Sequence, residues 1–129
     1  MDIQVPVSPG ELLDKITILR IKVARIQEAA KLANVKLELS LLEQIWQESG
    51  AAAHNVALEE RALQNVNEQL WDIEDRIRDK EARQTFDREF IELARAVYQH
   101  NDERAAIKKR VNLQLGSRIV EEKSYKPYR

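Results

Sequence analysis

The clearest sign of chemistry in this sequence is a polar interruption in an apolar helical stripe near the carboxyl terminus. The stripe begins with the apolar residues Phe86, Phe90, Leu93 and Val97. The next positions in phase are polar, His100 or Asn101 and then Arg104, and the apolar pattern resumes at Ile107 and Val111. Buried polar groups are costly unless they are partnered. The interruption therefore indicates either an internal network of satisfied ion pairs, which is the commoner cause, or an open pocket.

Antiparallel pairing of the segments before and after residues 83–86 would bring aromatic and charged side chains together at this interruption. The expected neighbours are Trp71 and Tyr98, Glu74 and Arg95, and Asn67 and Arg104. Such a group could hold a small anion, or it could be an interhelical ion pair beside an aromatic contact. The sequence leaves both interpretations open.

A second pattern places carboxylates on one helical face, at positions 68, 72, 75 and 79. Magnesium prefers oxygen ligands of this kind, and helical phosphohydrolases hold it between paired carboxylates on facing helices. However, Arg76 and Arg78 are spaced to pair with Asp72 and Glu74 within the helix, which favours a solvated charged face. We therefore expect no bound metal or cofactor. If magnesium does bind, Glu68, Asp72 and Asp75 are the candidate ligands.

Composition narrows the function classes. Lys and Arg total 21 against 22 Asp and Glu, so no strong field favours nucleic acid. The absence of cysteine excludes disulfides and thiolate chemistry, and two histidines are too few for a zinc site. Neither a signal-like amino terminus nor an apolar run of about 18 residues is present, so we expect a cytoplasmic protein with no membrane partner.

The elements that must position these groups are helices. The 129 residues include only three glycines and three prolines, and apolar residues recur every three or four positions. Ser8, Pro9 and Glu11 indicate a helix start with a capping box. A turn is expected near residues 27–30, although no strong breaker stands there and one continuous long helix is the alternative. Ser49 and Gly50 end a second helix, and a last helix begins near Asp87 and stops at Gly116.

These signals predict an all-α fold in a single domain spanning residues 1–129. It would be a bundle of about four long antiparallel helices, arranged as two helical hairpins, with short extended arms at both ends. The last helix is longer than a compact bundle needs, which suggests a protruding hairpin or a dimer. We expect the amino-terminal arm to lie on the bundle, and the carboxyl-terminal arm to pack back through Ile119, Val120 and Tyr125.

Several stretches carry a family resemblance. They are VPVSPGELLDKITILRIK at 5–22, KLANV at 31–35, LWDIEDRIR at 70–78, NDERAAIK at 101–108 and GSR at 116–118. Together they resemble a bacterial family catalogued as a domain of unknown function, whose members imply an accessory role in cell-surface polysaccharide metabolism. The resemblance directs attention to the polar residues inside these stretches, which are Glu11, Asp14, Lys15, Thr17, Lys22, Trp71, Glu74, Asp75, Arg78, Asn101 and Arg104.

The resemblance and the pattern together give a set of candidate ligand-binding residues. These are Glu11, Lys15, Lys22, Trp71, Glu74, Arg78, Asn101 and Arg104. We expect a non-enzymatic helical protein that forms a homodimer and binds a protein partner or a small anionic ligand. The alternative is a small all-α enzyme. It would be either a metal-dependent phosphohydrolase or a protein similar to the helical chorismate mutases, whose likeness rests on the cations Lys15, Arg20, Lys22 and Arg25.

Overall fold

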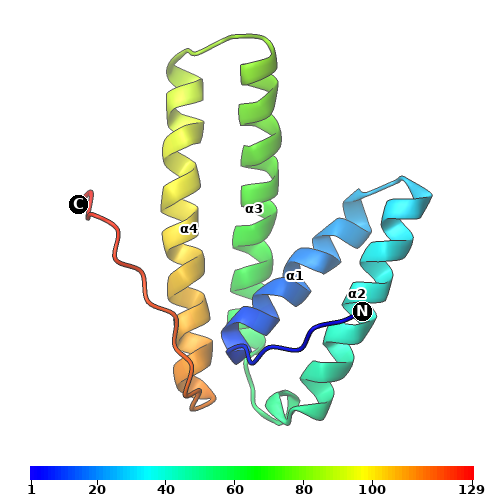
Figure 1. Cartoon of the computed structure of the whole chain (residues 1–129). Coiled ribbons are helices and arrows are strands. Elements are labelled where there is room, and N and C mark those ends of the chain that lie inside the picture. The colour runs from blue at the N-terminus through cyan, green and yellow to red at the C-terminus, as the bar shows by residue number, and fades with distance from the viewer.

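The computed structural model describes all 129 residues as two helical hairpins lying side by side (Figure 1). The elements are α1 (Pro9–Arg25), α2 (Ala29–Glu48), the short 3₁₀ turn η1 (Ala51–Ala53), α3 (Ala57–Ala82) and α4 (Arg88–Gln114). The predicted all-α class and the bundle of antiparallel helices are confirmed. None of these helices combines the length and apolar character that crossing a bilayer requires.

The helix ends follow the local signals in the sequence. At α1, the Ser8 hydroxyl accepts a hydrogen bond from the Glu11 amide over 3.2 Å, and at α4 the Asp87 carboxylate accepts one from the Phe90 amide over 3.0 Å. Each bond satisfies an amide that has no partner inside its own helix. Gly116 follows α4 with φ of 64°, the left-handed conformation that glycine adopts without strain.

The core lies where α1 packs against both α3 and α4. Its central cluster is formed by Leu13, Val56, Leu63, Val66, Ile107 and Val111. In contrast, α2 packs against α1 and η1 and contains no buried residue. The helix is therefore only half-buried even along its inner apolar stripe, because α2 is an outer layer on a three-helix core. The stripe consists of Leu32, Val35, Leu39, Leu42 and Trp46.

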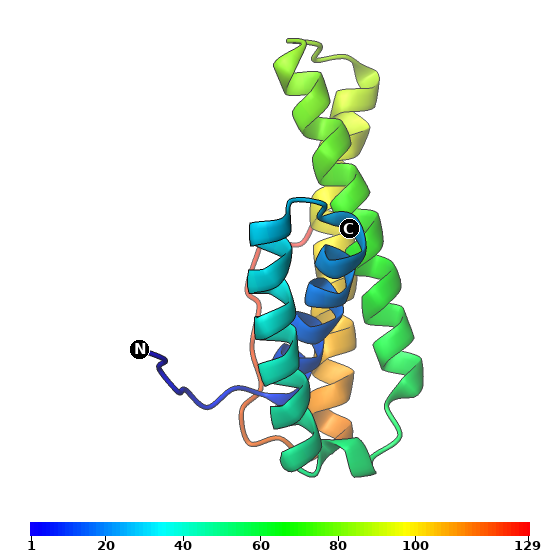
Figure 2. The same ribbon diagram turned by 90° about the vertical axis from the view of Figure 1, so that its right-hand side faces the viewer.

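The α3–α4 hairpin extends beyond the ends of α1 and α2 (Figures 1 and 2). This protrusion accounts for the 27 residues of α4. Ion pairs hold its tip, with Lys80 Nζ 2.9 Å from Asp87 Oδ2 and Arg76 Nη2 2.8 Å from Glu89 Oε1. Phe86 was expected in the buried stripe but is exposed here, since no other helix reaches the tip.

The two terminal arms behave differently. The amino-terminal end of the arm lies away from the helices (Figure 2) and residues 1–7 are exposed, although Val5 and Val7 line a hollow with the end of α2. The expectation that the arm lies on the bundle is therefore wrong for most of its length. The carboxyl-terminal arm runs beside α4 (Figure 1), where Lys123 Nζ lies 3.1 Å from Asp102 Oδ1 and the rings of Tyr98 and Tyr128 are 4.8 Å apart. Ile119 and Val120 are half-buried, as expected, but Tyr125 is 82% exposed. Tyr128, rather than Tyr125, packs against the bundle.

Candidate functional site

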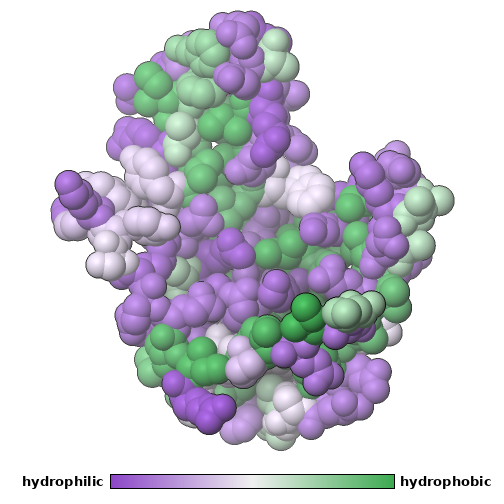
Figure 3. Space-filling model, in the orientation of Figure 1, coloured by the Kyte–Doolittle hydropathy of each residue, from purple (hydrophilic) through white to green (hydrophobic).

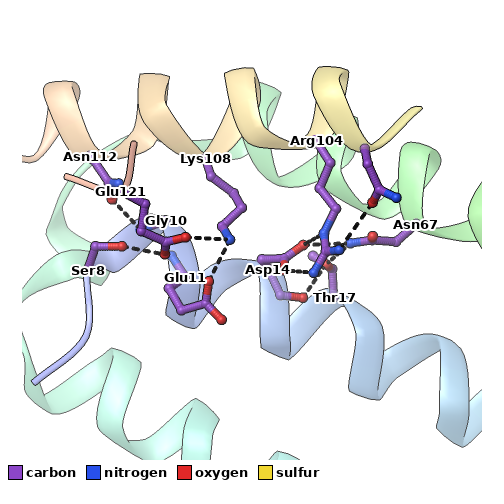
Figure 4. Close-up of polar contacts among 11 residues, drawn as sticks. Ser8, Gly10, Glu11, Asp14, Thr17, Asn67, Arg104, Lys108, Asn112 and Glu121 are labelled. Carbon is purple, nitrogen blue, oxygen red and sulfur yellow. Dashed lines mark hydrogen bonds and ion pairs between the residues drawn. The ribbon is translucent and has the colours of Figure 1, made fainter. Parts of the chain in front are cut away.

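The polar interruption of α4 is occupied by an ion pair that reaches across the bundle to α1 (Figure 4). Asp14 is fully buried, and its two carboxylate oxygens accept hydrogen bonds from Arg104, from Nε over 2.9 Å and from Nη2 over 2.5 Å. This two-point geometry is the strongest that a guanidinium and a carboxylate can adopt. The hydrogen bonds that Arg104 donates to Asp14 raise the pKa of Arg104, so the guanidinium stays charged.

Two further side chains complete the network around Asp14. Asn67 of α3 donates to the Asp14 carboxylate over 2.9 Å and to the Thr17 hydroxyl over 3.1 Å, while Thr17 donates to the backbone carbonyl of Asp14 over 2.8 Å. No buried side-chain nitrogen or oxygen lacks a partner. The interruption of the stripe is thus a satisfied network, which was the commoner of the two alternatives, and Asn67 and Arg104 meet as expected.

The sequence contained a signal for this network. Gly10, Asp14, Thr17 and Ile21 recur at helical spacing and all face the core of the bundle from α1. Asp14 and Thr17 appear among the polar positions that the resemblance singles out, but not among the candidate binding residues. A carboxylate between the buried side chains of Leu13 and Ile16 predicts a buried cation on another helix. The sequence around Asp14 does not indicate which helix supplies that cation.

A second ion pair joins the start of α1 to α4. Lys108 Nζ lies 2.5 Å from Glu11 Oε2 and 3.4 Å from Glu121 Oε2 in the carboxyl-terminal arm (Figure 4). Burial lowers the pKa of Lys108, but the hydrogen bond to Glu11 and the nearby carboxylates outweigh that effect and raise it overall. The capping box is therefore only half correct, since Ser8 caps the helix while Glu11 turns to Lys108.

Gly10 allows α1 and α4 to approach this closely. Its amide donates to Asn112 Oδ1 over 2.7 Å. A Cβ atom at position 10 would lie 2.4 Å from the backbone oxygen of Lys108 and 2.8 Å from Asn112 Oδ1, distances that real contacts do not tolerate. The first turn of α1 is thus held against α4 by backbone as well as by side chains.

Beside the Asp14–Arg104 pair, a cleft of 490 Å³ opens between α1, α3 and α4. Asn67 and the apolar side chains of Ile18 and Leu70 form part of its wall. The structure brings together in this cleft most of the candidates that the sequence proposed, namely Lys22, Trp71, Glu74, Arg78, Asn101 and Arg104. Asn101 and Arg104 also line a neighbouring cleft of 430 Å³, which contains Glu11 and Lys108.

Charges in the larger cleft are only partly compensated. Arg78 pairs with Glu74 over 3.2 Å within α3, as the sequence predicts, and Arg104 is held by Asp14. Lys22 projects from α1 at half-buried depth and takes part in none of the ion pairs. It is therefore the one cation of the cleft without a carboxylate partner.

Other expected neighbours do not meet. Tyr98 packs on Tyr128 of the carboxyl-terminal arm, whereas Trp71 lies beneath the guanidinium of Arg25 at 5.9 Å. No aromatic contact joins Trp71 to Tyr98, and Glu74 pairs with Arg78 rather than with Arg95. Chain reversal at the tip sets the general pairing of α3 and α4, but not the rotation of each helix about its own axis.

Two of the candidate binding residues lie outside the larger cleft. Lys15 directly follows Asp14 in α1, but its side chain is exposed on another side of the helix and makes no ion pair. Glu11 lines the smaller cleft, where Lys108 neutralises it.

The carboxylate face of α3 does not meet a matching face. No group of three His, Asp or Glu side chains converges in an arrangement that could hold a metal ion. Asp72 accepts a hydrogen bond from Arg25 of α1 over 2.5 Å, so its predicted pairing with Arg76 is wrong. Glu68 and Asp75 extend along the same helix without a facing carboxylate.

Comparisons with known proteins place the chain in a family. No curated protein and no solved structure matches it. The family described as a family of unknown function (DUF6165) matches residues 3–128, which include both hairpins and nearly all of both arms. The resemblance inferred from the sequence stretches is confirmed at the level of the family. This chain belongs to DUF6165, a family of unknown function.

Proposed function

We propose that this protein is a non-enzymatic binding protein whose cleft between α1, α3 and α4 takes a small anionic ligand. The observation that carries the proposal is the unpaired Lys22 in the same cleft as the rigidly held Arg104. A lysine ammonium at half-buried depth is partly desolvated, so it gains more from an incoming anion than a lysine in open water.

Arg104 supplies a second anchor for the anion. Two of its nitrogens are bound to Asp14, whereas Nη1 has only a weak 3.5 Å contact with Asn101 Oδ1. The side chain is 29% exposed, so Nη1 can donate to a ligand without breaking the pair with Asp14. Because the buried carboxylate fixes the guanidinium, little side-chain entropy is lost on binding.

The remaining wall of the cleft favours a ligand in which the anionic group is attached to a larger body. Trp71, Leu70 and Ile18 offer apolar surface, and Asp75 makes no ion pair and can accept a hydrogen bond from a hydroxyl. A phosphate or carboxylate carried on a hydroxylated body, such as a sugar phosphate, fits these groups best. That chemistry agrees with the accessory role in polysaccharide metabolism that the family resemblance implies.

The enzymatic alternatives find less support. A metal-dependent phosphohydrolase requires carboxylates on two facing helices, and the carboxylates of α3 have no such partners. For a mutase that binds a dicarboxylate, the cations of α1 would have to be free. Arg20 and Arg25 are instead paired with Glu60 and Asp72, over 2.6 Å and 2.5 Å.

The test is thermal unfolding of the protein and two lysine variants against sugar phosphates, inorganic phosphate, nucleotides and dicarboxylates, with and without magnesium. A ligand present at about 100 times its dissociation constant stabilises the folded state by about 2.7 kcal/mol. For a domain of this size that raises the melting temperature by roughly 10 °C. Lys22→Ala should abolish the shift, and Lys15→Ala, on the same helix but outside the cleft, should retain it.

Two results would contradict the proposal. One is a panel in which no anion shifts the melting temperature or the fluorescence of Trp71. The other is a shift that Lys22→Ala and Lys15→Ala reduce equally, because the cleft would then play no part in binding. Magnesium-dependent turnover of a phosphate ester would instead favour the phosphohydrolase.

A further inference from the structure

We propose that the outer face of α2 and the amino-terminal arm form an interface with a second copy of this chain, in which the two α2 helices lie antiparallel. This surface is separate from the anion cleft. The inner stripe of α2 packs on α1, but a second apolar stripe of Leu37, Leu41 and Ile45 faces outward at four-residue spacing. These side chains are 62%, 46% and 49% exposed. A helix that is apolar on two sides is normally covered on both.

The amino-terminal arm continues this apolar surface. Val5 and Val7 share a hollow of 560 Å³ with Ile45 and Trp46 at the carboxyl-terminal end of α2. Both valines and Ile3 are exposed, and the arm leaves the body of the molecule on the side of α2 (Figure 2). In Figure 3 its apolar side chains stand out on the front face of the molecule. The stripe and the arm thus form one patch, which we call the α2 patch.

The charges of α2 indicate that the partner is the chain itself. Both bases of the helix, Lys31 and Lys36, precede its three acids, Glu38, Glu43 and Glu48. Glu43 lies 3.9 Å from Arg20 of α1, so Lys31 and Glu48 near the two ends carry the pattern. This order opposes the helix dipole, which favours acids at the start and bases at the end. It also makes the helix complementary to an antiparallel copy of itself, since each lysine end then faces a glutamate end. A parallel copy would place like charges together.

The size of the patch sets what kind of dimer to expect. The 20 residues of α2 span about 30 Å. A contact strip of that length, as wide as the roughly 10 Å between packed helices, covers about 300 Å² per copy, whereas a standard interface uses about 800 Å². The helix face alone is too small, and the arm's Ile3, Val5 and Val7 must supply much of the rest. We therefore expect a reversible dimer with its twofold axis near Leu41.

The first experiment measures molar mass by light scattering across a dilution series. The protein should have twice the 15.0 kDa of one chain at concentrations on the order of 0.1 mM. Leu41→Lys buries a charge at the twofold axis and should raise the dissociation constant at least about a hundredfold. The matched control is Leu58→Lys on α3, which replaces a leucine that is 69% exposed outside the patch and should dimerise normally.

The proposal is overturned if the native chain is monomeric throughout the series, or if Leu41→Lys and Leu58→Lys both leave the dimer intact. Equal loss of dimer in both variants would also overturn it. Circular dichroism of each variant separates loss of the interface from loss of the fold.

The second experiment tests the antiparallel arrangement. Lys31→Glu and Glu48→Lys each place like charges opposite one another twice in the dimer, so each should raise the dissociation constant roughly tenfold. The double variant restores opposite charges and should recover the native value. Glu48→Lys agrees with the helix dipole, so its dilute monomer should not melt earlier. In Lys31→Glu the same gain offsets the loss of the exposed 3.4 Å ion pair with Glu28, so its monomer should melt close to the native temperature. Single variants without effect, or a double variant weaker than either, would overturn the arrangement.

Discussion

Replacing Asp14 by asparagine removes the one carboxylate that forms an ion pair with the half-buried Arg104, while leaving the side-chain volume almost unchanged. The remaining amide oxygen can still accept from Asn67 and from Arg104 Nε, as Asp14 Oδ1 does over 2.9 Å in each case. The amide nitrogen, however, takes the place of Oδ2 and faces the donor Nη2. The variant therefore combines an unpaired cation with opposed donors.

The structure allows the cost to be bounded. Removing one partner of a fully buried ion pair destabilises a protein by about 3–5 kcal/mol. Asp14 is fully buried but the Arg104 side chain is 29% exposed, so the freed guanidinium regains part of its hydration. We therefore expect Asp14→Asn to lower the free energy of unfolding by about 3 kcal/mol, at the lower end of that range. This is a large part of the roughly 5–15 kcal/mol that stabilises a typical domain.

Urea unfolding at neutral pH, followed by circular dichroism and tryptophan fluorescence, measures this difference. The double-mutant cycle adds Arg104→Gln and the double variant, which should cost less than the sum of the single changes by about 2 kcal/mol. Asp75→Asn, on an exposed carboxylate without an ion pair, is the control and should change stability by less than about 0.5 kcal/mol. If both single variants cost less than about 1 kcal/mol and their effects add, the pair is worth no more than a surface salt bridge and the reasoning fails.

Three further perturbations test the packing and the hairpin tip. Gly10→Ala should lower the free energy of unfolding by about 1–3 kcal/mol, because the new Cβ would clash with the Lys108 carbonyl. This cost should exceed the gain from alanine's higher helix propensity. A variant that is more stable in urea would contradict the close contact of α1 and α4. Leu63→Ala leaves a cavity in the core and should cost about 2–5 kcal/mol in thermal unfolding, and a smaller cost would mean that the site collapses. Two hydrogen bonds lower the pKa of Asp87, the larger effect coming from Lys80 and the smaller from the Phe90 amide. The charge on Asp87 therefore stabilises the folded state fully when the pH is above the unfolded pKa of about 3.9. This stabilisation is lost as the pH falls through the lower pKa of the folded state. The difference in unfolding free energy between the protein and Asp87→Asn should therefore close as the pH is lowered from about 5 to about 2, and a constant difference would contradict a role for the charge.

Local signals determine much of this fold, since each depends on residues close together in the chain. Ser8 and Asp87 cap the helices that follow them because a side-chain oxygen near a helix start satisfies an amide within the next three residues. Gly116 ends α4 through another local property, the left-handed conformation that glycine adopts without strain. The turn after Arg25 has no such signal, since Glu28 makes no side-chain capping hydrogen bond at the start of α2. The spacing of Ile107 and Val111 gives the buried face of α4, because helical periodicity depends on the sequence of one helix only.

Tertiary structure decides which faces meet. Arg104 finds Asp14 90 residues earlier in the chain, and Glu11 turns from its own helix cap to Lys108 because α4 lies beside it. The candidates of the cleft were chosen from local patterns and family stretches, but only the packing of α1 against α3 and α4 separates Lys22, inside it, from Lys15, outside it. Periodicity says which side of a helix is buried, whereas the partner depends on how each helix is rotated and placed against the others. That placement results from the packing of all side chains at once, so no single segment of the sequence contains it.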